Sequence, residues 1–306
     1  MRTRVNIKVL TVATVTLIAL AGCSSQTGRA FEIPTASAVT VSATEDPKIT
    51  RVVALANGSA EIISALGVKS ILIGRDIAST DVDLSDVPVV TSGHQVIPEK
   101  IISLNPDLVI IDKSTGPQNA LDALRSAGIR VVQTPEAWKL SDISVKVSAI
   151  ADAIGAPALG AQLNIAMANL SPSQSPTISG TRIAFLYLRG SSAIYLIGGK
   201  GSGADSLINA IGAVDVGAAA LANPFNSMTS ESMVSLNPEV ILLMTKGLAS
   251  TGGVAGFVDL PGVAQTEAGK NKRIIAVDDS LLLSFGPRTP DLLVQLLKAV
   301  EQVMQK

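Results

Sequence analysis

From residue 51 to the C-terminus, short apolar runs alternate with stretches whose apolar residues recur at helical spacing. The apolar runs predict strands at 51–56, 70–74, 108–112 and 128–133. The stretches between them predict helices at 59–66, 98–104 and 119–127, the first ended by Gly67 and the second by Asn105-Pro106. This alternation predicts an α/β fold with mostly parallel sheets flanked by helices.

The second half of the chain repeats the pattern of the first. The segment from Glu99 to Ile111 (EKIISLNPDLVII) recurs as the segment from Glu231 to Leu243 (ESMVSLNPEVILL). Two further pairs keep the same order, 58–67 with 203–212 and 127–132 with 268–275. Self-similarity in a fixed order predicts a duplication, and therefore two similar lobes, at 51–140 and 173–306.

The segment between the lobes, 141–172, has apolar residues at helical spacing, which predicts a long interlobe helix. Gly155 and Pro157 interrupt the spacing, so the connector is either kinked there or split into two helices. Because a helical connector is stiffer than a loop, we expect only a small movement of one lobe against the other.

The N-terminus has the layout of a secretion signal. Arg2, Arg4 and Lys8 precede an apolar run at 9–21, which is too short to span a bilayer stably. The small residues before Cys23 resemble the lipobox of bacterial lipoproteins, which implies removal of residues 1–22 and a lipid on Cys23. Residues 23–50 are rich in small and polar residues without periodicity, which predicts a flexible tether.

Composition narrows the possible partners. Without the three basic residues of the signal, 21 basic residues remain against 25 acidic ones, and no basic patch is visible, so nucleic acid is not expected as a partner. Cys23 is the only cysteine, so the folded part contains no internal disulfide. We expect a monomer.

Two α/β lobes that face each other form a cleft at the carboxyl ends of their strands. Four stretches are expected to reach it: 57–59, with Asn57 and Ser59; 198–203, with Lys200; 91–95, with His94; and 185–190, with Tyr187 and Arg189. The glycines of the first two also suit ordinary tight turns, and a lone histidine or a half-buried tyrosine is often without function.

Tyr187 and Arg189 are two positions apart in a strand and therefore share a face. His94, the only histidine, from one lobe and Tyr187 from the other would hold a metal between them. Two ligands are too few for a bare metal ion but are the number that haem requires. Arg189 would donate a hydrogen bond to the Tyr187 oxygen and favour its anion.

Three motifs carry a family resemblance: Gly-Ser-x-Glu-Ile with Ala-Leu-Gly, Glu-x-Ile-x-Ser-Leu-Asn-Pro-Asp-Leu-Val-Ile, and Phe-Gly-x-Arg-Thr-Pro. Over nearly all of 51–303 the chain resembles the helical-backbone binding proteins of ABC importers, which carry siderophores, cobalamin or haem. The segments 93–94, 187–190, 244–247 and 284–289 look like those of haemin-binding lipoproteins of the HmuT type.

The resemblance implies that His94 and Tyr187 are the axial ligands, that Arg189 bonds to Tyr187 and that Met244 lies close to the haem. Phe225 stands where some haemin binders have a tyrosine, so one hydroxyl is missing from the pocket. Helix starts and Lys200 are expected near the propionates.

The resemblance further implies that Glu99 and Glu231 dock to arginines on the two subunits of a permease dimer with its ATPase. Equivalent acids on duplicated lobes suit such a two-fold partner, although both also suit the first turn of a helix on electrostatic grounds. The implied activity is delivery of haem for iron acquisition, at the extracytoplasmic face of the plasma membrane, by a binding protein and not by an enzyme.

Other functions are possible on the same sequence. A ferric-siderophore or cobalamin binder would need no axial histidine, and Arg288 and Trp138 could serve there. A zinc or manganese receptor would need several histidine, aspartate and glutamate ligands, which one histidine argues against. An extracytoplasmic hydrolase could use His94 with Ser59, but the chain has no Gly-x-Ser-x-Gly motif.

Overall fold

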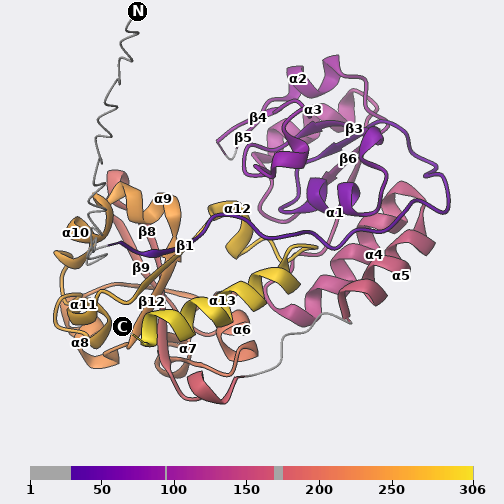
Figure 1. Cartoon of the computed structure of the whole chain (residues 1–306). Coiled ribbons are helices and arrows are strands. Elements are labelled where there is room, and N and C mark those ends of the chain that lie inside the picture. The colour runs from indigo at the N-terminus through magenta and orange to yellow at the C-terminus, as the bar shows by residue number, and fades with distance from the viewer. Residues whose placement is uncertain (1–28, 94, 169–174, 306) are drawn as a thin grey trace, which may run out of the picture.

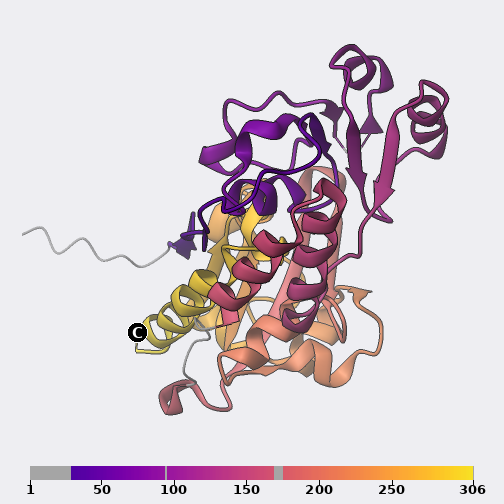
Figure 2. The same cartoon turned by 90° about the vertical axis from the view of Figure 1, so that its right-hand side faces the viewer.

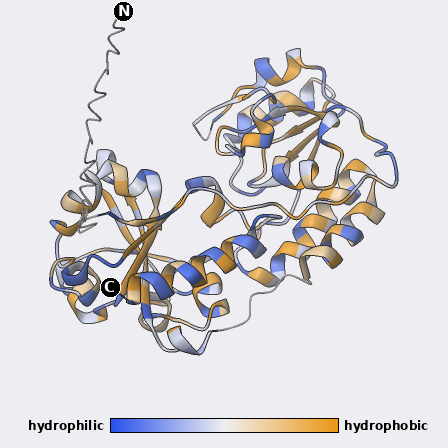
Figure 3. Cartoon of the chain, in the orientation of Figure 1, coloured by the Kyte–Doolittle hydropathy of each residue, from blue (hydrophilic) through white to orange (hydrophobic). Residues whose placement is uncertain are grey.

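The computed structural model describes residues 29–93, 95–168 and 175–305 and shows two α/β lobes (Figure 1). Each lobe has its own sheet of mostly parallel strands with helices on both faces, as the sequence predicts. The strands are the most hydrophobic parts of both lobes (Figure 3). Within the described ranges, no helix combines the length and apolar character needed to cross a membrane.

The N-terminal lobe is built on a four-stranded parallel sheet in the order β3-β2-β6-β7. Its strands are β2 (Val52–Ala54), β3 (Leu72–Arg75), β6 (Leu108–Ile111) and β7 (Arg130–Gln133), and a short hairpin adds β4 (Thr91–Ser92) and β5 (Gln95–Val96). Its helices are α1 (Ser59–Ala65), α2 (Pro98–Ser103) and α3 (Gln118–Ser126). Both β2 and β6 are wholly buried, which explains their unbroken apolar sequences.

The C-terminal lobe repeats this sheet and extends it. The parallel order β10-β8-β12-β13 corresponds strand for strand to β3-β2-β6-β7, as the duplicated sequence predicts. The strands are β8 (Arg182–Arg189), β9 (Ile194–Gly198), β10 (Val214–Asp215), β11 (Phe225–Ser227), β12 (Val240–Met244) and β13 (Ile274–Val277). The helices are α6 (Ala204–Ala210), α7 (Val216–Ala220), α8 (Ser230–Leu236), α9 (Thr245–Ser250), α10 (Gly253–Val258), α11 (Glu267–Asn271), α12 (Asp279–Leu282) and α13 (Thr289–Met304).

The connector consists of two helices, α4 (Ile143–Ile154) and α5 (Pro157–Ala168), which lie side by side (Figure 1, Figure 2). Gly155 ends α4 in the left-handed conformation with φ of 76°, and the chain reverses there. A Cβ at Gly160 would lie 2.6 Å from the Cβ of Ala151, so the glycine permits the close approach of the pair. Of the two alternatives that the sequence left open, the structure shows the split.

The prediction of a flexible tether is wrong for residues 31–50. The strand β1 (Phe31–Ile33) pairs in parallel with β13 at the edge of the C-terminal sheet, and Ile33 is buried. The chain then crosses to the other lobe, where the Val41 amide donates to the Ala65 carbonyl at 2.9 Å. Phe31 alternates with Ile33 and Val39 with Val41, a spacing typical of extended chain, but this spacing does not indicate which sheet or lobe they pack on. Residues 1–28, which include the predicted signal and Cys23, lie outside the described residues.

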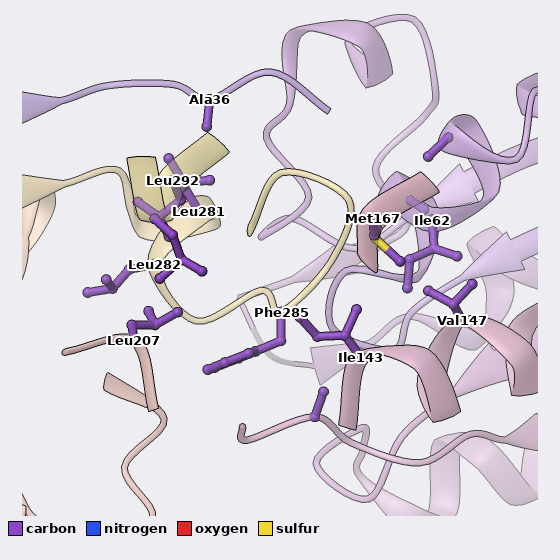
Figure 4. Close-up of a cluster of buried hydrophobic side chains, with 14 of the residues drawn as sticks. Ala36, Ile62, Ile143, Val147, Met167, Leu207, Leu281, Leu282, Phe285 and Leu292 are labelled. Atoms are coloured by element: carbon purple, nitrogen blue, oxygen red, sulfur yellow. The ribbon is translucent and has the colours of Figure 1, made fainter. Parts of the chain in front are cut away.

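One apolar core passes through both lobes at their base. It joins Ile62 of α1 and Val147 of α4 to Leu207, Leu282 and Phe285 of the C-terminal lobe (Figure 4). The opposite face of the N-terminal sheet packs on α2 and α3, and the equivalent face of the C-terminal sheet packs on α8 to α11. A rotation of one lobe against the other would have to disrupt this shared core.

Asp215 is a buried acid in the C-terminal lobe. Its Oδ1 caps α7 by accepting a hydrogen bond from the Ala218 amide at 2.9 Å, while its Oδ2 has no hydrogen-bond partner among the described residues. Burial raises the pKa of Asp215 from 3.8 to about 6. Because the folded-state pKa is the higher one, the folded protein binds more protons than the unfolded chain between these values. Stability is therefore lost as pH rises toward 6.

We expect Asp215→Asn, which keeps a capping oxygen, to raise the free energy of unfolding at pH 7.5 by roughly 2 kcal/mol. The gain should shrink as pH falls from 6 toward 4, because Asp215 itself becomes neutral there. Urea unfolding of both proteins at pH 5 and pH 7.5 measures this, with Asp152→Asn, an exposed aspartate of α4, as the control. A loss of stability that is equal at both pH values would contradict the burial argument.

Candidate functional site

A cleft of about 620 Å³ lies between the lobes. This volume is within the range of small-molecule sites. Charged side chains from both lobes converge on it, namely Asp76, Asp112 and Glu136 from the N-terminal side, Arg189, Lys246 and Asp279 from the C-terminal lobe, and Lys146 from α4. A smaller groove of about 250 Å³ between the connector and α13 has no charged side chain in its lining. The interlobe cleft is therefore the candidate site.

Tyr187 lies on the C-terminal wall of the cleft, near the end of β8. Its ring packs edge-on against Phe225 of β11 at 5.8 Å between centroids, and Phe225 in turn packs edge-on against Phe185 at 6.5 Å. Phe225 is not among the lining residues, so its role is to fix the Tyr187 ring from the side. Met244, at the end of the neighbouring strand β12, lines the same wall and is 5% exposed.

Arg189 shares the cleft face with Tyr187, as predicted from the strand alternation. Its guanidinium lies over the face of the Tyr187 ring, with Cζ 4.6 Å from the centroid, so the predicted hydrogen bond from Arg189 to the Tyr187 hydroxyl is wrong. Asp279 of α12 accounts for this position, because its Oδ1 lies 3.4 Å from a terminal nitrogen of Arg189. No local pattern at 187–189 could indicate an acid 90 residues further along the chain.

The N-terminal wall is organised around Asp112, which follows β6 and is 5% exposed. Its Oδ2 accepts a hydrogen bond from the Asn57 amide at 2.7 Å, and its Oδ1 accepts from the hydroxyls of Ser114 and Thr115. The side-chain amide of Asn57 donates to the Leu283 carbonyl of the other lobe at 3.0 Å. Asn57 therefore lines the cleft, as predicted, and its side chain also links the two lobes by a hydrogen bond at the base of the cleft.

Sequence reasoning missed Lys146, which lines the cleft from α4 and is 2% exposed. Its Nζ donates to the Ser284 carbonyl at 2.8 Å. Burial lowers the pKa of Lys146 to about 8, and the nearby carboxylates, Glu61 first, only partly offset this effect. A signal was present in the sequence, since Lys146 falls on the apolar stripe of α4 that Ile143, Val147 and Ile150 define.

Besides Phe225, three residues that were predicted to reach the pocket do not line the cleft. The Ser59 hydroxyl is buried and donates to the Ala56 carbonyl at 2.6 Å, which closes the turn before α1 and also removes it as a nucleophile. Lys200 is exposed outside the cleft. Arg288 is 4% exposed and lies against Glu61 at 2.9 Å and Asp81 at 3.2 Å, an ion-pair network inside the protein.

His94 lies outside the described residues, so its predicted role stays a prediction. Its neighbours Gly93 and Val96 line the cleft. Glu99 and Glu231 are both exposed, in the first turns of α2 and α8.

The two linked lobes and the charged cleft between them define a two-lobed ligand-binding protein. The sequence profile of the periplasmic binding protein family matches residues 52–281, and the chain belongs to this family. It is 30% identical over 284 residues to the uncharacterized ABC transporter substrate-binding lipoprotein YvrC of Bacillus subtilis (strain 168), a match that covers 89% of this chain and 84% of the relative. The protein is thus an extracytoplasmic substrate-binding protein of the ABC importer class and not an enzyme.

Solved structures similar to this chain include those of haem-binding proteins. The haem-binding protein HmuT is 29% identical with a TM-score of 0.78 over 89% of this chain and 97% of that one. RhuT from Roseiflexus sp. RS-1 is 33% identical with a TM-score of 0.75, over 83% of this chain and 99% of that one. BhuT, solved in complex with two haems, is 26% identical with a TM-score of 0.74, over 83% and 98%. HmuT has also been solved with a histidine, a tyrosine and an arginine each replaced by alanine, and that tyrosine and arginine are two positions apart.

Proposed function

We propose that this protein binds haem in the interlobe cleft and delivers it to an ABC importer for iron acquisition, held at the membrane by a lipid on Cys23. The observation that carries the proposal is the pair of Tyr187 and Arg189 on one cleft wall, two residues apart on β8. The same residue types at the same spacing were chosen for replacement in HmuT.

A phenol at this position suits ferric haem. The porphyrin supplies four nitrogens, so the protein needs to provide only axial ligands, and tyrosine oxygen is one that ferric iron accepts. The guanidinium of Arg189, with its Cζ 4.6 Å from the ring centroid, holds the Tyr187 ring from its face and leaves the cleft wall positively charged beside it. His94 is proposed as the second ligand, which the position of Gly93 and Val96 in the cleft lining supports.

The propionates of haem would be oriented by the charges of the cleft. Asp76, Asp112 and Glu136 make the N-terminal wall acidic and would repel them. Lys146 is already hydrogen-bonded to a carbonyl and buried, whereas Lys246 is exposed at the cleft. We therefore assign propionate pairing to Lys246, in place of Lys200.

The three acidic side chains of the N-terminal wall, Asp76, Asp112 and Glu136, also disfavour binding of an anionic ferric siderophore. Such a ligand requires several cations, but Arg288, expected to serve there, is enclosed by Glu61 and Asp81. Trp138, 41% exposed at the cleft, can stack on any flat aromatic ligand and does not separate the two functions.

A haemin titration tests the proposal. Trp138 is the only tryptophan and lines the cleft, so bound haem should quench the intrinsic fluorescence while a Soret band of the bound form grows. Both signals should saturate together. Iron-free protoporphyrin, which cannot use the Tyr187 oxygen, should bind at least about tenfold more weakly. Absence of a bound-form Soret band, or equal affinity for the two porphyrins, would refute haem coordination at this cleft.

A further inference from the structure

The helices α2 and α8 present the same pair of side chains to solvent. Glu99 is in the first turn of α2 and Glu231 is in the first turn of α8. Three residues after each glutamate stands an exposed aliphatic residue, Ile102 with 37% and Val234 with 47% of its surface exposed. Residues at i and i+3 are neighbours on a helix surface. Each lobe therefore shows a carboxylate beside an aliphatic side chain.

The exposed aliphatic residues are not part of the core of their own lobe. The residues that anchor the two helices are Ile101 and Met233, both 0% exposed, on the sheet faces opposite the shared core. Single exposed apolar residues are common on any surface. Here, however, the duplication brings the two to the same position, since the alignment of Glu99 with Glu231 also aligns Ile102 with Val234.

The two helices are also held in the same way. Arg51, just before β2, donates from its guanidinium to the Leu104 and Asn105 carbonyls at the end of α2, at 2.6 and 3.0 Å. Arg182, the first residue of β8, donates to the Asn237 carbonyl at the end of α8. Both asparagines have positive φ, 48° and 39°. A cation at a helix C-terminus is electrostatically favourable, and each clamp fixes its helix to a central strand of the sheet.

The amides of the two arginines complete the correspondence. The Arg51 amide donates to Asp107 Oδ2 at 3.1 Å, and the Arg182 amide donates to Glu239 Oε2 at 3.0 Å. The surface pair and its support are thus duplicated together. Among the described residues, neither Glu99 nor Glu231 has a salt-bridge partner.

We propose that Ile102 and Val234 are the apolar halves of two equivalent contact patches, Glu99 with Ile102 and Glu231 with Val234. Their partner is a pair of two-fold related subunits, each offering a cation beside an apolar side chain. The aliphatic residue would exclude water from the ion pair, and an ion pair is stronger when it is shielded from water. This inference rests on the proposed delivery to an importer and specifies the surface that delivery uses.

The experiment compares haem-loaded full-length proteins as activators of ATP hydrolysis by the importer in proteoliposomes. We expect Ile102→Ser/Val234→Ser to require an about tenfold higher concentration for half-maximal stimulation, with the haemin titration unchanged. The matched control is Val145→Ser/Ile165→Ser, which replaces aliphatic residues of the connector that are 56% and 66% exposed. The control should stimulate as the wild-type protein does.

The charge-reversed protein Glu99→Lys/Glu231→Lys separates the outcomes. Suppose that the charge-reversed protein no longer stimulates ATP hydrolysis, while Ile102→Ser/Val234→Ser stimulates it at the same concentrations as the wild-type protein. The proposed role of Ile102 and Val234 is then overturned, and delivery through the two glutamates stands. If the connector control is weakened as much as the tested variant, the effect is not specific to the patches and the inference is overturned. If wild-type protein with bound haem gives no stimulation, the proposed delivery itself fails, and the inference fails with it.

Discussion

Tyr187→Phe is expected to lower the affinity for haemin by about 100-fold or more and to remove the phenolate contribution from the absorption spectrum. Phenylalanine keeps the ring and therefore the edge-on contact with Phe225 at 5.8 Å and the position of Arg189 over the ring. The substitution removes only the oxygen, so a loss of affinity is a loss of coordination and not of packing. The measurement is a haemin titration followed by absorption and by Trp138 fluorescence.

Tyr195→Phe is the matched control, because Tyr195 of β9 is the other tyrosine of the chain and does not line the cleft. It should bind haemin as the wild-type protein does. An unchanged affinity and spectrum in Tyr187→Phe would remove Tyr187 as a ligand. Combining it with His94→Ala should abolish the bound-form Soret band.

Arg288→Met is expected to lower the free energy of unfolding by about 3–5 kcal/mol, more than any other substitution discussed above or below. Arg288 is 4% exposed and pairs with Glu61 of α1 at 2.9 Å, so methionine would leave a buried carboxylate without its cation. Asp81, 3.2 Å from the Nε of Arg288, would also lose its partner. Urea unfolding at pH 7.5, followed by circular dichroism, measures the loss.

The exposed pair of Arg125 with Asp122, at 3.0 Å, provides the comparison for this prediction. Arg125→Met should cost less than about 1 kcal/mol, because exposed ion pairs contribute little. Adding Glu61→Gln to Arg288→Met should recover part of the lost stability, since it removes the uncompensated charge. Folded Arg288→Met should still bind haemin normally, and a specific loss of ligand binding would return Arg288 to the ligand site.

The fold was predictable because its signals are local or repeated. Apolar runs marked strands such as Leu108–Ile111 that are buried on both faces, and the repeated Leu-Asn-Pro segments predicted two similar lobes. The period of two in a strand was enough to place Tyr187 and Arg189 on one face. These features depend on neighbours in sequence or on a copy of the same sequence.

The features that could not be predicted depend on contacts between distant segments. Nothing near Phe31 indicates that it pairs with Ile275, and nothing near Arg288 indicates that Glu61 is its partner. Arg189 was placed on the correct face, but its guanidinium is positioned by Asp279. The sequence therefore indicated the face on which Tyr187 and Arg189 lie, but not the distant residues, such as Asp279, that position them.

The short edge strand β1 has a consequence for how far the protein can move. Phe31 is fixed in the C-terminal sheet, so only seven residues lie between it and Cys23. Fully extended, a segment of this length spans about 30 Å. With a lipid on Cys23, the C-terminal lobe would stay within one protein diameter of the bilayer surface. The protein would then diffuse only along the membrane, in a thin layer that also contains the importer. Its local concentration near the importer would be far above that of a carrier without an anchor.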